Sequence, residues 1–385
     1  MLPSCGGLAT ELRELRAEVE VLRAKNAELL AAEHFRQLRT NAWPGLGIQC
    51  LKVDYPKVRC NYLPDAVVWA MSMDGKALFN GQPQSAPVVK RYESEHMTMH
   101  QMQPKVRPYF KVNGSRPIWS HKLWSAYQSI IGRGKSVSPM AYPHAAEDIS
   151  LAIKHFIGPI KHLSIGVISS ITPWVEVTLK ELGATSITTV DYNKPFLERK
   201  LRAMGLSVMA WHDLSGVYAS GRRFDLLVSF SGIEHDGLGR YGDPVNPYGD
   251  LAAMRELRAL LAVRGKLLLG IPVANQDDIY YPNHRIYGPV RLPWLLKESG
   301  LSLGGRVWNG RVVEGGLGRA ADAPPLYRRR WCANERKLKR LSSGTKANVF
   351  ACNTTNDGPN LLGDYQHQPV LVLERLRDTP VPVAP

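Results

Sequence analysis

The stretch FDLLVSFSGIEHDGLGRYGDPVNPYGD, residues 224–250, decides the fold, because it joins an apolar strand to a helix through a loop rich in functional groups. Residues 224–230 are nearly all apolar, which is typical of a strand covered on both faces. Glycines and prolines then interrupt regular structure while acidic, histidine, arginine and tyrosine side chains gather. Ligands of open α/β sheets bind where strands end. The loop is therefore predicted to carry the site; the alternative is a solvated connection that caps the next helix.

Strands and helices alternate on both sides of this stretch. At this spacing, alternation predicts right-handed βαβ units, and hence an α/β fold with a Rossmann-like, doubly wound, mostly parallel sheet. A late strand at 368–374 suits a sheet edge. The predicted strands are 163–168, 186–191, 206–210, 224–230, 265–271 and 301–307, and the predicted helices are 118–131, 146–156, 173–182, 194–204, 250–261 and 289–299.

The N-terminus has a heptad pattern typical of a coiled coil. Leu12, Val19 and Asn26 fall at a positions, and d positions hold Leu8, Leu15, Leu22 and Leu29. In a parallel pair Glu11 would face Arg16, Glu18 would face Arg23, and a single Asn at a favours two strands. We expect a homodimer through this coil. The alternative is a lone amphipathic helix that packs on its own domain.

The chain divides into five expected segments. They are a coiled-coil helix (1–42), an irregular linker with a basic and aromatic cap (43–145), the Rossmann-like domain (146–310), a basic Gly-rich insertion (311–365), and the last strand with a tail (366–385). The aromatic side chains of the cap either stack on bases or pack on the main domain.

A net charge of +15 and a pI near 9.6 predict attraction to anions, whether nucleic acid, phosphorylated or sulfated substrates, or acidic membrane surfaces. The basic runs 328–330 and 336–340 form the best nucleic-acid patch, with a solvated face as the alternative. Nucleic-acid binding is not the favoured function.

The five cysteines form no CxxC pair, which argues against a structural zinc finger. Cys50 with Cys60, and Cys332 with Cys352, would form disulfides only in a secretory compartment. No segment has the length and apolarity of a membrane span. The compartment stays open, with the cytoplasm favoured over a secretory lumen.

The ends of the first two strands predict the kind of cofactor. Asp191 ends the second strand, where an acidic residue accepts ribose hydroxyls; the alternative role is a helix cap. The first loop, from Gly166 to Pro173, has one glycine where a dinucleotide fingerprint needs three. This argues against NAD and FAD, whereas S-adenosylmethionine has no phosphate to place there.

The strand succession, the acidic end of Val190-Asp-Tyr192 and the Ile-Glu-His235 sequence resemble class I S-adenosylmethionine-dependent methyltransferases. Residues 172–176, 189–193, 231–250 and 283–289 are similar to a domain-of-unknown-function family first recognised in nematodes. The likeness covers roughly residues 104–308 and the last strand. It implies methyl transfer. The polar residues of the predicted cleft favour a small polar acceptor, such as a sugar or glycan hydroxyl.

With this chemistry, His235 is the expected base, since its ordinary pKa lies near neutrality. Glu234 or Asp236 would orient its ring, Arg240 would hold an anionic substrate, and His284 is a second candidate base. We expect the cofactor to contact Gly166, Ser169, Ser170, Thr172, Asp191, Tyr192 and Ser231, and the substrate to contact Tyr241, Asp243, Arg285 and Tyr287.

Three alternatives remain open at this point. A divalent metal, which is not favoured, would use His235, Asp236, Asp243 and His284. A catalytically silent Rossmann-like binding or scaffold protein would explain the loss of glycines in the first loop. A nucleic-acid-binding protein would use the basic insertion and show a steep salt dependence.

Overall fold

A computed structural model describes residues 5–40, 117–132, 142–315 and 368–377, with short strands at 49–50, 60–61, 78–79 and 82–83. Within 142–315 the exceptions are 143, 239–240, 242, 244–247, 274–277, 281–283 and 289–290. The basic runs at 328–330 and 336–340, Cys332 and Cys352 therefore lie outside the described residues.

The centre of the fold is an eight-stranded sheet in the order β15-β14-β16-β11-β10-β6-β7-β9. Strands β11, β10, β6, β7 and β9 are mutually parallel, and β16 lies antiparallel between β11 and β14. The prediction of a mixed α/β fold with a mostly parallel sheet is confirmed. The strands are β6 (Ile165–Ile168), β7 (Ile187–Asp191), β9 (Leu206–Ala210), β10 (Phe224–Phe230), β11 (Leu261–Gly270), β14 (Ser302–Trp308), β15 (Arg311–Glu314) and β16 (Val370–Glu374).

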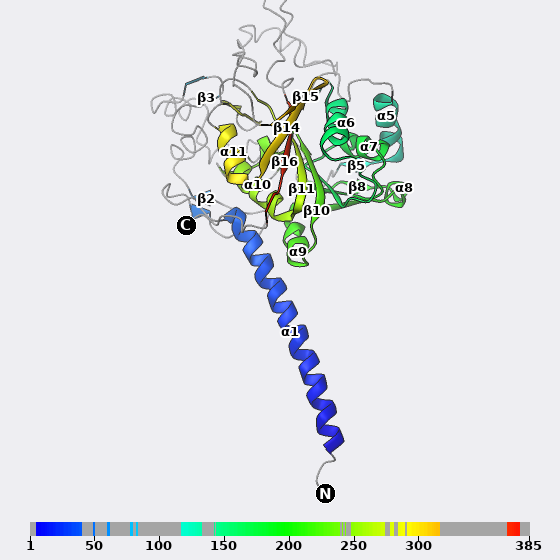
Figure 1. Ribbon diagram of the computed structural model, residues 1–385, viewed down its shortest axis with the longest axis vertical. Coiled ribbons are helices and arrows are strands. Elements are labelled where there is room, and N and C mark those ends of the chain that lie inside the picture. Colours follow the sequence, from blue (N-terminus) through cyan, green and yellow to red (C-terminus); the bar gives the residue numbers. More distant parts are fainter. Residues whose placement is uncertain are drawn as a thin grey trace, which may run out of the picture.

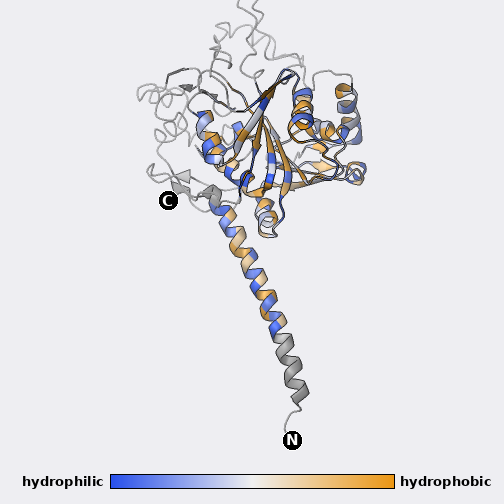
Figure 2. Cartoon of the chain, in the orientation of Figure 1, coloured by the Kyte–Doolittle hydropathy of each residue, from blue (hydrophilic) through white to orange (hydrophobic). Residues whose placement is uncertain are grey.

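Alternate residues of the central strands feed two separate cores, one on each face of the sheet. In β10, Leu227 belongs to one core and Leu226 and Val228 to the other; in β11, Leu267 and Leu269 face away from Leu268. The apolar colour of the central strands in Figure 2 reflects this burial on both faces. The predicted wrapping of the sheet by helices on both sides is thus confirmed.

The helices divide between these faces (Figure 1). One core contains residues of α9 (Leu214–Ala219), α10 (Gly249–Leu260) and α11 (Arg291–Ser299). The other contains residues of α5 (His121–Ile131), α6 (Ala145–Phe156), α7 (Trp174–Glu181) and α8 (Arg199–Ala203). Trp119 and Trp124 of the cap are fully buried, so these rings pack on the main domain.

The N-terminus forms one long helix, α1 (Cys5–Thr40), that projects from the domain in Figure 1. Only its C-terminal part is docked: Phe35 is buried, and its ring lies 5.2 Å from that of Tyr218 in α9. Side chains from Arg16 to Leu30 are exposed. The helix is as expected; its pairing with a second copy remains a prediction.

Two expectations about elements are wrong. The late strand does not lie at an edge, because β16 pairs with both β11 and β14. The helix expected over 194–204 is reduced to α8. Its first half becomes β8 (Phe196–Leu197), which pairs with β5 (Ile118–Trp119) through a bond from the Phe196 N–H to the Pro117 carbonyl. This pairing with a distant segment outweighs local helix propensity.

Among the described residues, three short antiparallel strand pairs lie outside the main sheet. Strands β1 (Gln49–Cys50) and β2 (Cys60–Asn61) are antiparallel with Cys50 opposite Cys60, and β3 (Leu78–Phe79) pairs with β4 (Gln82–Pro83). Strand β12 (Asp278–Tyr280) pairs with β13 (His284–Ile286). Within the described ranges, none of the helices combines the length and the apolarity that a membrane crossing requires.

Candidate active site

Three parallel strands, β6, β7 and β10, end side by side at one edge of the sheet. Directly after β6 and β10, Ser169 and Ser231 have φ of 60° and 53°, the left-handed region that non-glycine residues avoid. The Ser169 N–H donates to the Val190 carbonyl and the Ser231 N–H to the Gly270 carbonyl, each at 2.8 Å. These bonds to neighbouring strands hold both strained turns in place.

The two turns approach each other so closely that only glycine fits at position 232. A Cβ atom built there would lie 2.7 Å from the Ser169 Cβ. The first loop and the loop after β10 are therefore in contact, and both line one pocket.

This pocket lies at the carboxyl edge and has about 390 Å³ of empty space, open solvent at its mouth included. Its lining mixes serine, carboxylate, histidine and tyrosine groups, and comprises Ser169, Ile171, Asp191, Tyr192, Ser231, Gly232, His235, Asp236, Tyr241 and Asp243. Eight of these ten residues are among the candidates predicted from the sequence.

Asp191 ends β7 at the wall of the pocket and is nearly buried. Burial raises the pKa of its carboxyl to about 6, and the hydrogen bond that Oδ1 accepts from the Asn193 N–H (2.6 Å) opposes this rise. The bond orders the turn after the strand. It leaves the second carboxylate oxygen as an acceptor at the position where ribose hydroxyls bind in Rossmann-like sheets.

Next to Asp191, Tyr192 connects this strand end with the loop after β10. Its hydroxyl donates to Asp236 Oδ1 at 3.0 Å, and its ring stacks on Trp211 at 5.1 Å. Asn193 adds a second link, from Nδ2 to the Tyr241 carbonyl at 2.8 Å. Asp236 is therefore engaged by Tyr192.

Glu234 is the carboxylate beside the candidate base His235. It is fully buried, accepts a 2.6 Å hydrogen bond from the Ser231 hydroxyl, and has Oε1 3.7 Å from His235 Nε2. The His235 ring also packs edge-on against Tyr241, with centroids 5.2 Å apart. Of the two proposed orienting residues, Glu234 has the suitable position.

The hydroxyl of Tyr142 extends this chain of hydrogen bonds from the segment before α6, because it donates to Ser231 Oγ at 2.8 Å. The Tyr142 ring contacts Trp174 and Phe230. A residue of the predicted cap segment, Tyr142, thus bonds directly to a residue that lines the pocket. Trp119 does the same for the first loop, since its indole N–H donates to the Ile171 carbonyl at 3.0 Å.

Tyr241 and Asp243 form a turn at the pocket mouth. Both carboxylate oxygens of Asp243 accept backbone N–H bonds, from Tyr241 at 3.1 Å and from Gly237 at 2.8 Å. Asp243 lines the pocket and at the same time fixes the shape of this loop.

A buried carboxyl, Glu176 of α7, supports the first loop from behind. Ser170 donates to its Oε2 at 3.0 Å and Thr189 to its Oε1 at 2.7 Å. Burial raises the pKa of Glu176 to about 7, although both hydrogen bonds act in the opposite direction. Ser170, expected at the cofactor, thus serves the loop behind the pocket.

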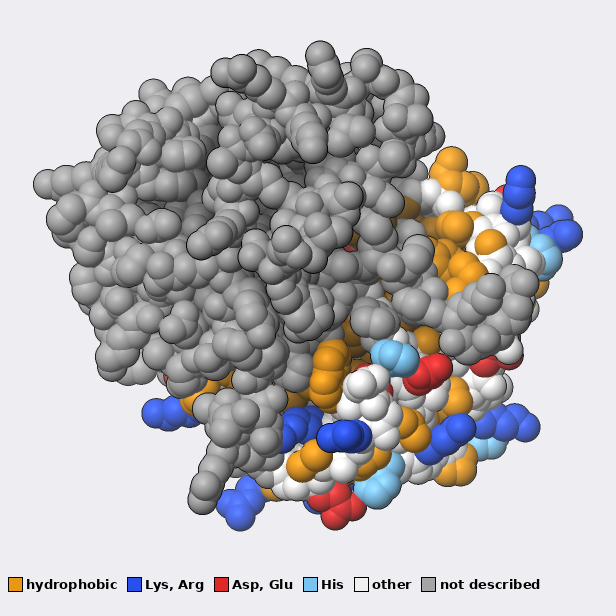
Figure 3. Space-filling model, turned by 90° about the horizontal axis from the view of Figure 1, so that it is seen from above, with side chains coloured by type: hydrophobic (Ala, Val, Ile, Leu, Met, Phe, Trp, Pro, Cys, Tyr) orange, Lys and Arg blue, Asp and Glu red, His pale blue; other side chains and the backbone are white. Residues whose placement is uncertain are grey.

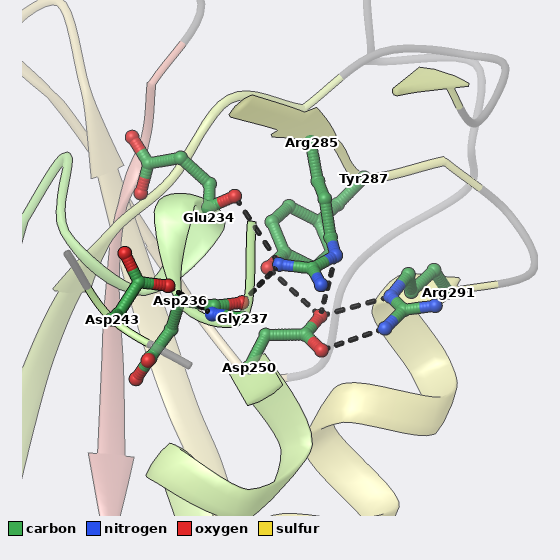
Figure 4. A network of polar contacts seen from close by, with 8 residues as sticks. All are labelled: Glu234, Asp236, Gly237, Asp243, Asp250, Arg285, Tyr287 and Arg291. Carbon is green, nitrogen blue, oxygen red and sulfur yellow. Dashed lines mark hydrogen bonds and ion pairs between the residues drawn. The ribbon is translucent and has the colours of Figure 1, made fainter. Parts of the chain in front are cut away.

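Beneath the loop after β10 lies a network of buried charges around Asp250 (Figure 4). Arg291 makes a two-pronged ion pair with this carboxylate, at 2.6 and 2.8 Å, and the Tyr287 hydroxyl donates to it at 3.1 Å. Arg285 lies 3.8 Å from Asp250 and donates from Nη1 to the carbonyls of Asp236 (2.6 Å) and Glu234 (3.4 Å). The network therefore holds the backbone that carries His235.

The charges in this network shift one another's ionisation. Burial alone would raise the pKa of Asp250, but Arg285 and Arg291 hold it below its usual value. Burial lowers the pKa of Arg285 and raises that of Tyr287 well above the normal range.

Several predicted site residues lie away from the pocket lining. Gly166 is inside β6 with its Cα facing Leu227, and the Thr172 carbonyl accepts the Ser170 hydroxyl. Arg285 and Tyr287 are fully buried under the loop, while Arg240 lies outside the described residues. His284 is buried behind His235, with ring centroids 6.3 Å apart.

Sequence reasoning missed Tyr142, Glu176 and the role of Asp250. Each acts through a partner 13 to 89 positions away in the chain. Glu176 and Asp250 lie in stretches that carry the family resemblance, 172–176 and 231–250, but neither stretch reveals these distant partners. The one available signal was Glu176 on an apolar helix segment, since a buried carboxylate needs partners.

No group of three or more His, Cys, Asp or Glu among the described residues is arranged to hold a metal ion. His235, Asp236, Asp243 and His284 therefore do not converge into such a cluster. On the described part of the face in Figure 3, Lys and Arg side chains are spread along the rim and do not gather in one patch.

Solved structures with similarity to this chain include three methyltransferases. The 1,6-didemethyltoxoflavin-N1-methyltransferase of Burkholderia thailandensis, with bound S-adenosylhomocysteine, is 15% identical over 52% of this chain and 91% of that one, with a TM-score of 0.30. An S-adenosylmethionine-dependent methyltransferase of Thermotoga maritima is 15% identical over 50% and 93% (TM-score 0.28). An O-methyltransferase family protein of Burkholderia thailandensis is 11% identical over 83% and 100% (TM-score 0.29).

The sequence has no match among curated proteins. A family model does match, over residues 164–301, which run from the residue before β6 to the residue before β14. The match is narrower than the expected 104–308, but it includes the first loop, Asp191 and the loop after β10. The resemblance is thereby confirmed, and residues 164–301 match the family described as Caenorhabditis protein of unknown function, DUF268.

Proposed function

We propose that this protein is an S-adenosylmethionine-dependent methyltransferase that acts on the hydroxyl of a small polar acceptor, such as a sugar or glycan. The observation that carries the proposal is the pocket at the ends of β6, β7 and β10, because Asp191 and His235 both line it. Cofactor and acceptor would share this pocket.

The residues present fit the cofactor. The free acceptor oxygen of Asp191 would bind the ribose hydroxyls, and Ser169 and Ser231 would offer small polar groups beside the methionine part. The first loop contains no glycine after Gly166. The close approach of its backbone to the cofactor would therefore depend on the left-handed conformation of Ser169. The bound cofactor would supply an electrophilic methyl group on a sulfonium.

His235 would remove the proton from the acceptor hydroxyl as that oxygen is methylated. The resulting positive ring would be stabilised by the buried Glu234 carboxylate, 3.7 Å away. Tyr241 restricts the ring from the side. Arg285 would keep this arrangement in place by holding the carbonyls of residues 234 and 236.

Calorimetric titration of the purified full chain with S-adenosylmethionine, S-adenosylhomocysteine and NAD tests cofactor binding. We expect micromolar binding of the first two ligands, no binding of NAD, and at least a tenfold loss for Asp191→Ala. Glu181→Ala is the matched control, because this exposed carboxylate lies at the far end of α7. Unchanged thermal melting of both variants would show that they are folded.

His235→Gln separates catalysis from cofactor binding. It should bind S-adenosylhomocysteine like the wild type and lose methyl transfer to any acceptor found in a screen of sugars and glycans. Failure of the folded wild type to bind either cofactor would contradict the proposal. The silent binding protein would then be the better description.

A further inference from the structure

The exposed part of α1 has an apolar face that stays open to solvent beside the described part of its own domain. Val19, Leu22 and Leu29 are 41%, 63% and 59% exposed, and Leu30 beside them is 65% exposed. Asn26 lies exposed among them. Large apolar side chains that are exposed in a row mark an interaction surface.

The domain uses the opposite side of the helix. Phe35 is 2% exposed against Tyr218, and His34 also approaches the Tyr218 ring, at 6.3 Å. At 100° per residue, Val19, Leu22, Asn26 and Leu29 lie roughly 120–180° around the helix from Phe35. The docking of α1 on its own domain therefore leaves the apolar face open, and the lone-helix alternative does not account for it.

The pattern of this face selects its partner. Val19 and Asn26 at a positions, with Leu22 and Leu29 at d, continue a heptad that the sequence extends back through Leu15, Leu12 and Leu8. One Asn at an a position favours a two-stranded parallel pair in register, where the amides meet. A membrane surface or an unrelated groove would not call for this spacing.

The flanking charges complement a second copy of the same helix. In a parallel pair, Glu18 at g of one helix faces Arg23 at e of the other. Both side chains are exposed, and in the single helix Arg23 pairs with the equally exposed Glu20, at 2.8 Å. Arg23 can exchange this surface contact for the partner's Glu18 at little cost.

We propose that α1 forms a parallel two-stranded coiled coil with α1 of a second copy of this chain, along Leu8–Leu29. Each domain is attached to the C-terminal end of the coil through the contact of Phe35, so the dimer would contain two pockets. The proposal is independent of methyl transfer.

Light-scattering measurement of molar mass after gel filtration, on the full chain at low to high micromolar concentration, tests the pairing. The wild type should have twice the mass of a single chain. Leu22→Lys with Leu29→Lys should be monomeric, because the charges lie in the seam while lysine preserves helicity. Val21→Lys is the matched control: Val21 is 67% exposed and off the seam, so this variant should stay dimeric.

These substitutions fall on exposed side chains, so circular dichroism and melting of the domain should be unchanged. A monomeric wild type at the highest concentration would overturn the proposal. So would a double variant that keeps the dimer mass.

Cysteine crosslinking tests the orientation. Val19→Cys places identical residues opposite each other at an a position of a parallel pair, so oxidation should give a covalent dimer. Val21→Cys, with the same native cysteines in the background, should not. Equal crosslinking of both variants, or of neither, would contradict a parallel seam.

Discussion

At the scale of single residues, Ser169 holds an unfavourable conformation at the most constrained point of the pocket. Its φ of 60° is one that glycine adopts without strain, and its backbone N–H is fixed to Val190 at 2.8 Å. Rossmann-like loops usually place a glycine here. The first loop has no glycine at this position, and serine takes the backbone path that a glycine would permit.

Ser169→Gly should raise the free energy of unfolding by up to about 1 kcal/mol, because relief of left-handed strain exceeds the added entropy of the unfolded chain. Ser220→Gly is the matched control: Ser220 has φ −71°, so the same exchange should lower stability. Urea denaturation of both variants measures the difference. An equal loss of unfolding free energy in Ser169→Gly and Ser220→Gly would show that Ser169 is not strained.

Glu176 provides a pH-dependent prediction. Its pKa in the folded chain, about 7, is above the ordinary 4.5 because of burial. A raised carboxyl pKa gives stability that is fully present below pH 4.5 and lost as the pH rises through 7, here by roughly 3 kcal/mol. Glu176→Gln imitates the protonated form and should remove this loss.

Unfolding free energies of wild type and Glu176→Gln, measured from pH 4.5 to pH 8, should therefore agree at the acid end, diverge progressively up to about pH 7 and differ by a constant amount above it. Asp191, with its pKa raised to about 6 by burial, contributes in the same direction, so Asp191→Asn is measured in parallel. A wild-type slope that persists unchanged in Glu176→Gln would contradict the assignment.

At the scale of elements, the loop between β10 and α10 keeps its shape through contacts with β13. Arg285 in β13 and Arg291 in α11 both lie near Asp250, and within the described residues 232–238 it is Arg285 that donates to backbone carbonyls, those of Glu234 and Asp236. Removal of one partner from a buried ion pair costs several kcal/mol. The two arginines should therefore differ in what they control.

Arg285→Lys keeps the charge and loses the forked donor. Hydrogen exchange followed by mass spectrometry should show faster amide exchange across residues 232–238. Exchange in the rest of the domain should change less. Arg291→Lys should weaken the whole domain without a selective effect on that loop. If both variants loosen the loop to the same extent, the clamp is not specific to Arg285.

How far the sequence predicts these elements depends on how local their causes are. Strands β9 and β10 follow from apolar runs and lie at the expected residues. The order of the sheet does not follow, because β16 enters between β11 and β14 from more than 50 positions beyond β15. Arg285 was expected in the pocket, since spacing locates a side chain at the carboxyl edge and cannot tell whether it lies above or beneath the loop.

At the scale of the whole molecule, α1 has two faces with separate tasks, one for the domain and one for the proposed partner helix. Phe35 makes the docking contact, and the seam residues lie on the other side. Because the faces do not overlap, loss of one contact should leave the other intact. A test of whether docking and pairing can be lost separately therefore examines the two-face description of α1 more strictly than a test of either contact alone.

Phe35→Ala should undock α1 from Tyr218 without loss of the dimer. Truncation of a buried aromatic residue removes about 3 to 5 kcal/mol of packing at a well-filled site, so the C-terminal turns of α1 should fray. Limited trypsin digestion should then cleave at Arg36 faster than in the wild type, while light scattering still gives the dimer mass. Leu30→Ala, which truncates an exposed side chain, is the control and should digest like the wild type. A monomeric Phe35→Ala variant would mean that docking and pairing are one cooperative event, because the domain would then be needed to hold α1 in the helical form that pairs.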